Sequence, residues 1–286
     1  MTKFVKEIFT IVVLLAVVSA TTVIYLESQD TSGTITPKDD FRVAKRVAFI
    51  GDSVTWGINP DLGPMSFARY GWAQMLTGNA SASPGPTKTQ NLTTLWPNVT
   101  WKDFSLPGNT IRYYKEDARI KEVFDYAPDL VFFMLGGNDL LNYLRDGVLN
   151  ATENAQLTDN VDYILSKIRS NLPDAKIVVL NYYDLFDTFS DKITQRDLLE
   201  YRNLSTATSE SNVMMKDTAI RYGCHNIDIY QPFMHHCYGR YMGDVGMLVP
   251  PFVKTPLDGF NIHPNTNGYE MIYETVYTEL ARLKAA

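Results

Sequence analysis

A serine near the start of the chain and a histidine near its end have neighbours that suit acyl-transfer chemistry. Ser53 follows the apolar run "RVAFIG" and precedes a segment of small and aromatic residues. His263, one of only four histidines, lies in the turn-forming segment "LDGFNIHPNTNGY". A hydroxyl nucleophile needs a base to take its proton, and an imidazole can act as that base near neutral pH. These segments could therefore supply the nucleophile and the base that acyl transfer needs.

Acyl transfer also needs hydrogen-bond donors for the negative charge that develops on the substrate oxygen. Gly108 follows the expected strand "TWKDFSL", and residues 136–139 (Gly-Gly-Asn-Asp) follow the apolar run "DLVFFML". In a parallel sheet, the carboxyl ends of the strands lie at one edge, where ligands bind. We therefore expect these residues and Ser53 to gather around one site.

Strands and helices alternate along the chain after residue 44. Two of the expected strands are continuous apolar runs, which is typical of strands buried on both faces. The alternation predicts an α/β domain with a mostly parallel sheet between helices. Strands are expected at residues 46–51, 100–106, 129–135, 176–183 and 226–233, helices at 67–76, 113–124, 161–170, 198–222 and 269–283, and a loop at 77–97.

Four blocks of sequence together resemble the SGNH (GDSL-type) hydrolases. They are "FIGDSVTWG", "FSLPGNT", "LGGND" and "DGFNIHPN", in that order, and the resemblance spans nearly all of the chain beyond residue 44. It implies a flavodoxin-like, three-layer α/β/α domain with a mostly parallel, five-stranded sheet. It also implies a serine esterase that uses no metal or organic cofactor.

The resemblance assigns a role to each matched residue. Ser53 would be the nucleophile, and His263 the general base and later the general acid. The oxyanion hole would be formed by the backbone N–H groups of Ser53 and Gly108 and by the side-chain amide of Asn138. The substrate would be a carboxylic ester, and small acyl groups on carbohydrate and longer lipid esters both remain open.

The third member of the triad departs from the family pattern. The family usually has an aspartate three residues before the histidine, where this chain has Phe260. We prefer Asp258, five residues before His263, as the carboxylate that orients the imidazole. The alternative is a Ser–His pair in which Asn261 or a backbone carbonyl orients the ring.

The same residue types also occur in structural roles and in enzymes of different chemistry. A serine after a strand is often a helix cap, and Asp-Gly or Pro-Gly often forms a turn. Asp52 is expected to be structural, because a phosphatase nucleophile there commonly needs a second acid at position 54, which is Val54. The same machinery could pass its acyl group to an alcohol, as an acyltransferase, and a non-catalytic, carbohydrate-binding relative is a further alternative.

The N-terminal residues predict export. Residues 8–26 contain no charged side chain and follow Lys3 and Lys6. Their length suits either a cleaved signal peptide or a retained membrane anchor, and both leave the remainder outside the cytoplasm. We expect a signal or anchor at residues 1–26, a polar tether at 27–44 and the hydrolase domain at 45–286.

Two further features agree with export. Five Asn-X-Ser/Thr sequons are present, which could be glycosylated in a eukaryotic source. Cys224 and Cys237 are the only cysteines, and either a short-loop disulfide or two buried thiols would fit. The sequons begin at Asn79, Asn91, Asn98, Asn150 and Asn203.

The charge and the histidine and cysteine positions indicate which binding partners to expect. The net charge is −6 and no basic block lies outside the N-terminus, so a nucleic-acid partner is not expected. His235, His236 and Cys237 do not predict a metal site, because adjacent histidines point apart and no carboxylate follows at ligand spacing. We expect a monomer whose acyl pocket is walled by residues 182–205 and 234–256.

Overall fold

The computed structural model describes most of the chain beyond the N-terminal run. All described residues belong to one compact unit, Thr36–Ala286, and no helix among them is long and apolar enough to cross a membrane. The predicted signal or anchor lies outside this part, as do Asp258, Asn261, His235, His236 and Cys237. The described residues are 38, 40–62, 69–78, 88–116, 118–143, 149–185, 198–234 and 262–286.

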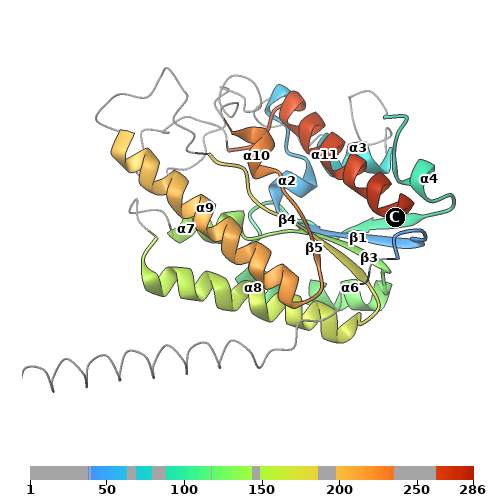
Figure 1. Cartoon of the computed structure of the whole chain (residues 1–286), viewed down its shortest axis with the longest axis horizontal. Coiled ribbons are helices and arrows are strands. Elements are labelled where there is room, and N and C mark those ends of the chain that lie inside the picture. Colours follow the sequence, from blue (N-terminus) through green and yellow to red (C-terminus); the bar gives the residue numbers. More distant parts are fainter. Residues whose placement is uncertain are drawn as a thin grey trace, which may run out of the picture. The chain divides into compact units, whose positions relative to one another are not determined.

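Five parallel strands form one sheet in the order β2-β1-β3-β4-β5 (Figure 1). Val47 of β1 pairs with Trp101 of β2 on one side and with Leu130 of β3 on the other. This order reverses direction between β1 and β3, and such a switch point is where ligands bind in flavodoxin-like folds. The strands are β1 (Arg46–Gly51), β2 (Thr100–Asp103), β3 (Leu130–Met134), β4 (Lys176–Leu180) and β5 (His225–Ile227).

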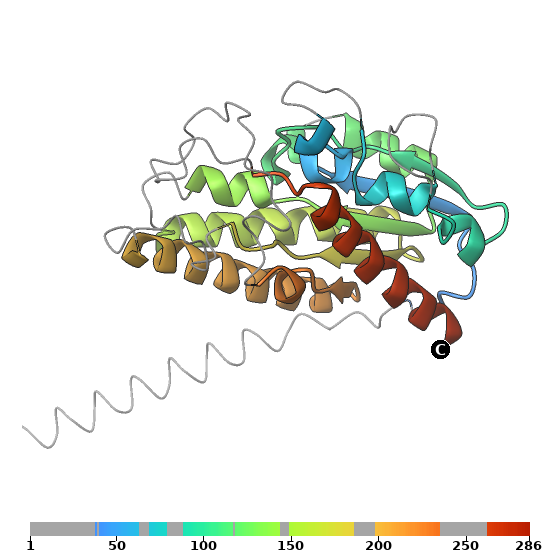
Figure 2. The same cartoon turned by 90° about the horizontal axis from the view of Figure 1, so that it is seen from above.

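Helices cover both faces of the sheet, as expected for three layers. Successive side chains of a strand point to opposite faces: Phe49 joins the hydrophobic cluster on one face and Ile50 the cluster on the other. Figures 1 and 2 show α11 on the face opposite to α8. The first face carries α3 (Trp72–Thr77), α4 (Leu92–Leu95) and α11 (Thr266–Ala285), and the second carries α5 (Ile111–Glu116), α6 (Arg119–Tyr126), α8 (Ala151–Asn171) and α9 (Leu198–Arg221).

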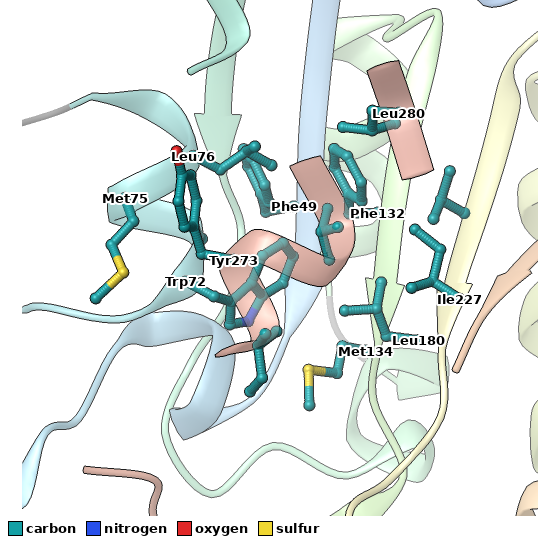
Figure 3. Packing of buried hydrophobic residues seen from close by; sticks show 14 of the residues in the cluster. Phe49, Trp72, Met75, Leu76, Phe132, Met134, Leu180, Ile227, Tyr273 and Leu280 are labelled. Atoms are coloured by element: carbon teal, nitrogen blue, oxygen red, sulfur yellow. The ribbon is translucent and has the colours of Figure 1, made fainter. Parts of the chain in front are cut away.

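Aromatic side chains hold the first face together (Figure 3). Phe49 and Phe132 stack with ring centroids 5.1 Å apart, and the Trp72 ring packs edge-on against both. Tyr273 and Leu280 of α11 are buried in the same cluster. This packing fixes α11 against that face of the sheet, and His263 lies in the turn that leads into this helix.

Short helices lie beside the carboxyl ends of the strands. These are α2 (Ser53–Trp56), the 3₁₀ turn η1 (Pro60–Leu62), α7 (Gly137–Tyr143) and α10 (Tyr230–Phe233). None of these four was predicted from the sequence. The expected helix at 113–124 is two helices, α5 and α6, and the expected loop at 77–97 contains α4.

The expected strand over residues 226–233 is wrong beyond Ile227. Backbone N–H groups that would continue a strand are taken by side chains instead. The Asn181 side chain accepts from Ile229 N at 2.7 Å, and the Asp228 side chain accepts from Tyr230 N at 2.9 Å. The chain therefore turns into α10.

The boundary between tether and domain also needs correction. Phe41, inside the expected tether, is fully buried in the core, and its carbonyl accepts a 2.9 Å hydrogen bond from the Trp96 ring nitrogen. Folded structure therefore begins before residue 45. Cys224 is a buried thiol, and burial raises its pKa to about 12. Cys237 lies outside the described residues, so the disulfide and the pair of buried thiols both stay predictions.

Candidate active site

Ser53 is the first residue of α2, directly after β1. The Asp52 carboxylate caps this helix by accepting from Val54 N at 2.9 Å, so the serine hydroxyl is not used as the cap. A Cβ on Gly51 would lie 2.1 Å from Thr55 Oγ1 and 3.0 Å from the Met134 carbonyl oxygen. The turn from strand to helix therefore requires glycine at position 51, and it presents Ser53 at the switch point.

His263 lies against this serine. Its Nε2 is 2.8 Å from Ser53 Oγ, although 210 positions separate the two residues in sequence. Both side chains are more than nine-tenths buried. Burial lowers the pKa of His263 to about 4. The imidazole is therefore neutral near pH 7, which is the form that can accept a proton.

Three side chains from distant parts of the chain hold the turn that carries His263. Tyr183, just after β4, donates from its hydroxyl to the Ile262 carbonyl at 2.8 Å. Asn59 donates to Thr266 Oγ1 at 3.1 Å, and Asp61 accepts from Thr266 N at 2.8 Å. Their contact with the His263 turn was not predicted from the sequence. Their partners are 79 to 207 positions away, so no local pattern marks them.

Gly108 lies in a tight turn after β2. Asn109 N donates to the Leu106 carbonyl at 3.1 Å, and Pro107 and Gly108 occupy the two central positions, as in a type II turn. Gly108 has φ +78°, which glycine adopts without strain, and an added Cβ would meet nothing within 4 Å. Glycine is therefore needed here for its backbone conformation and not for space.

The first turn of α7 braces this Gly108 turn. The Asn138 side-chain nitrogen donates to the Asn109 carbonyl at 2.8 Å, and Asp139 accepts from Ile111 N at 2.8 Å. A carboxamide nitrogen carries two hydrogens, so the bond to Asn109 uses only one of them. The three predicted oxyanion donors, Ser53, Gly108 and Asn138, thus belong to the ends of three neighbouring strands.

Two buried carboxyl groups adjoin site residues in the sequence: Asp52 precedes Ser53, and Asp139 follows Asn138. Burial, with a smaller contribution from the charge of Asp139, raises the pKa of Asp52 to about 7. Burial likewise raises the pKa of Asp139 to about 6. Both groups hold a proton more readily than an exposed aspartate does. The site consequently carries less negative charge against a developing oxyanion than its sequence implies.

A partly open pocket adjoins Ser53 and Asn138. Its wall is largely apolar and comes from β3, α7, the segment after β4 and the residue before His263. Part of the expected wall, residues 182–205, is confirmed by Tyr182, Tyr183 and Leu185. The apolar lining includes Met134, Leu140, Leu141, Tyr182, Leu185 and Ile262.

The remaining predicted site residues lie outside the described part. Asp258 and its alternative Asn261 stay predictions, as does the other expected wall, residues 234–256. Within the described ranges, no group of three or more His, Cys, Asp or Glu side chains is arranged to hold a metal ion.

The GDSL-like Lipase/Acylhydrolase family matches residues 49–271, a span that includes Ser53, Gly108, Asn138 and His263. The chain belongs to this family. This GDSL-like hydrolase is accordingly an ester-cleaving serine hydrolase. No protein with a curated description matches its sequence.

Solved structures share the fold of this GDSL-like hydrolase at low sequence identity. LAE5, an alpha/beta hydrolase enzyme from the metagenome of Lake Arreo, superposes with a TM-score of 0.56 at 18% identity, over 85% of this chain and 99% of LAE5. A variant of Axe2, an acetyl xylan esterase from Geobacillus stearothermophilus, gives 0.54 at 16% identity, over 84% of this chain and 96% of Axe2. These likenesses agree with the three-layer α/β/α architecture.

Proposed function

We propose that this chain hydrolyses carboxylic esters through an acyl-enzyme on Ser53, with His263 as general base and acid. The observation that carries the proposal is the 2.8 Å contact between Ser53 Oγ and His263 Nε2. A neutral imidazole at that distance can take the hydroxyl proton as the oxygen attacks. The lowered pKa of His263 supports this role, because the ring stays unprotonated at neutral pH.

The reaction would run in two halves. Ser53 Oγ attacks the ester carbonyl carbon while His263 Nε2 takes its proton, and the tetrahedral intermediate then expels the alcohol, which receives that proton. Water next attacks the acyl-enzyme and gives a proton to Nε2. The acid leaves as Ser53 Oγ recovers its proton, so the enzyme returns to its starting state.

The oxyanion would be held by Ser53 N–H, Gly108 N–H and the Asn138 amide. The bond from Asn138 to Asn109 supports this assignment, because it fixes the amide beside the Gly108 turn. Losing one such donor typically lowers kcat by about 10²–10³. Asp258 would orient the imidazole from its other nitrogen.

A direct test uses p-nitrophenyl acetate and butyrate with the full-length protein. Ser53→Ala and His263→Ala should each reduce hydrolysis to the background rate. Ser211→Ala is the matched control, because this buried serine on α9 has no hydrogen-bond partner among the described residues and lies outside the site. Turnover by Ser53→Ala at the wild-type rate would refute the proposal.

Adding an alcohol such as glycerol to the same assay separates hydrolysis from acyl transfer. The proposed hydrolase releases free carboxylic acid as its main product. A mainly transesterified product would instead identify an acyltransferase with the same acyl-enzyme.

We also propose that the domain acts outside the cytoplasm, either secreted or anchored through residues 8–26. The uncharged run after Lys3 and Lys6 supports this proposal. Protease added to intact cells should digest the domain if it is anchored, and the domain should appear in the extracellular or periplasmic fraction if it is cleaved. Recovery of uncleaved protein in the cytoplasm would contradict the proposal.

A further inference from the structure

The pocket beside Ser53 has a more extensive apolar wall than an acetyl group can cover. It is partly open to solvent and is lined by Met134 at the end of β3, Leu140 and Leu141 of α7, and Tyr182 and Leu185 after β4. An acetyl group contributes one methyl and would leave most of this wall without an apolar partner. Apolar surface gains free energy when it is removed from water, so the wall favours a larger apolar occupant.

The polar residues of the wall do not contradict an apolar occupant. The Asp52 carboxylate already accepts from Val54 N, and Thr208 of α9 is only 2% exposed. Ser53 and Asn138 also line the pocket, and both belong to the proposed reacting centre. The apolar volume therefore adjoins the carbonyl that Ser53 would attack.

The pocket suits the acyl part of an ester better than the alcohol part. After the first half-reaction the alcohol departs, whereas the acyl group stays bonded to Ser53. Met134 and Leu140 are each less than 5% exposed, so this part of the wall lies inside the domain. An interior position suits the group that is retained.

We infer that this pocket binds the acyl chain and that the preferred substrates are esters of unbranched aliphatic acids longer than acetate, such as hexanoate and octanoate. The inference rests on the proposed function, because it assigns the acyl group carried by Ser53. Each methylene that enters the pocket should raise kcat/KM by up to about fourfold.

The test compares p-nitrophenyl acetate, butyrate, hexanoate and octanoate, each below its aggregation limit. These esters share one leaving group, so the ratio of their kcat/KM values reports the acyl chain alone. We expect kcat/KM to rise along the series and the octanoate-to-acetate ratio to exceed about ten.

Two substitutions test whether the acyl chain of the substrate lies in this pocket. Leu141 and Leu149 are both half-buried and pack on the same hydrophobic cluster, but only Leu141 lines the pocket. Leu141→Trp should lower the octanoate-to-acetate ratio at least tenfold, while Leu149→Trp should leave the ratio as in the wild type. The ratio is independent of how much protein folds, because both esters meet the same active molecules.

The outcomes separate this inference from the esterase itself. Highest kcat/KM on acetate, with activity still abolished in Ser53→Ala, would overturn the acyl-chain inference and leave the esterase intact. Equal changes of the octanoate-to-acetate ratio in Leu141→Trp and Leu149→Trp would show that the acyl chain does not lie in this pocket. Absence of any Ser53-dependent hydrolysis would overturn the proposed function, and the inference with it.

Discussion

The Tyr183 hydroxyl donates to the Ile262 carbonyl at 2.8 Å, and Ile262 immediately precedes His263. The Tyr183 ring stacks on Phe233 with centroids 4.7 Å apart, which limits the movement of the hydroxyl. The end of β4 thereby fixes the backbone that aims the imidazole at Ser53. Tyr183 is thus a positioning residue, since it acts through His263 and not on the reacting atoms.

Tyr183→Phe should lower kcat by about three- to tenfold on every ester. The substitution removes one hydrogen bond, worth about 1 kcal/mol, and keeps the ring that packs on Phe233. The phenylalanine should leave KM nearly unchanged, because only the position of His263 is affected. Steady-state kinetics on butyrate measure both constants.

Tyr277→Phe is the matched control. Its hydroxyl also makes a hydrogen bond, 3.0 Å to Thr94 Oγ1, but lies on α11 away from Ser53. The control should retain wild-type kcat. Equal kcat in Tyr183→Phe and the wild type would show that the hydrogen bond from Tyr183 to Ile262 does not position His263.

Much of the site could be predicted because its residues follow local patterns. Ser53, Gly108 and Asn138 each come just after a strand, and parallel strands bring such positions to one edge. The hydrogen bond from Tyr183 to Ile262 could not be predicted, because it joins residues that are distant in the sequence. The strand predicted beyond Ile227 failed for a related reason: the Asn181 side chain takes its backbone donors.

The pH dependence of kcat/KM should report the buried imidazole. Protonation of His263 removes its ability to accept the Ser53 proton, so activity is lost as pH falls through the pKa of the ring. Burial alone lowers that pKa to about 4. A carboxylate beside the ring would favour the protonated form and raise the pKa.

Asp258→Asn should therefore shift the acid limb of the profile to lower pH, towards about pH 4. It should also lower kcat/KM, by up to about 10⁴ if the aspartate fixes the ring as in other serine hydrolases. Asn261→Asp offers a comparison, because it tests the alternative orienting residue. Superimposable profiles for Asp258→Asn and the wild type would exclude Asp258 from the triad.

Stability should fall with rising pH because of Asp52. Its pKa is raised from 3.8 in the unfolded chain to about 7 in the folded one, so the folded state binds more protons between these values. The free energy of unfolding therefore decreases as pH rises through this window. Asparagine cannot ionise and can still accept from Val54 N.

Asp52→Asn should accordingly be more stable than the wild type at pH 8, by about 1–3 kcal/mol, with a smaller difference at pH 4.5. Chemical denaturation at the two pH values measures this difference. Asp174→Asn removes one exposed carboxyl and controls for the change in net charge. A stability difference that does not grow with pH would mean that Asp52 ionises freely in the folded protein.

Gly108→Ala tests whether the backbone conformation at this position matters for activity, because the substitution does not disturb packing. The added methyl meets nothing within 4 Å, so its cost comes only from holding an L residue at φ +78°, about 1 kcal/mol. Relief of this strain would rotate the Gly108 N–H away from the oxyanion. Steady-state kinetics should then show kcat lowered by about tenfold or more, up to the 10²–10³ expected for a lost donor.

Gly223→Ala is the matched control for this strain. It imposes a similar cost at φ +62°, on the turn after α9 and away from Ser53. Because this turn contributes no donor to the oxyanion, Gly223→Ala should lose comparable stability and keep wild-type kcat. Equal activity loss in both variants would trace the effect to unfolding and remove Gly108 from the oxyanion hole.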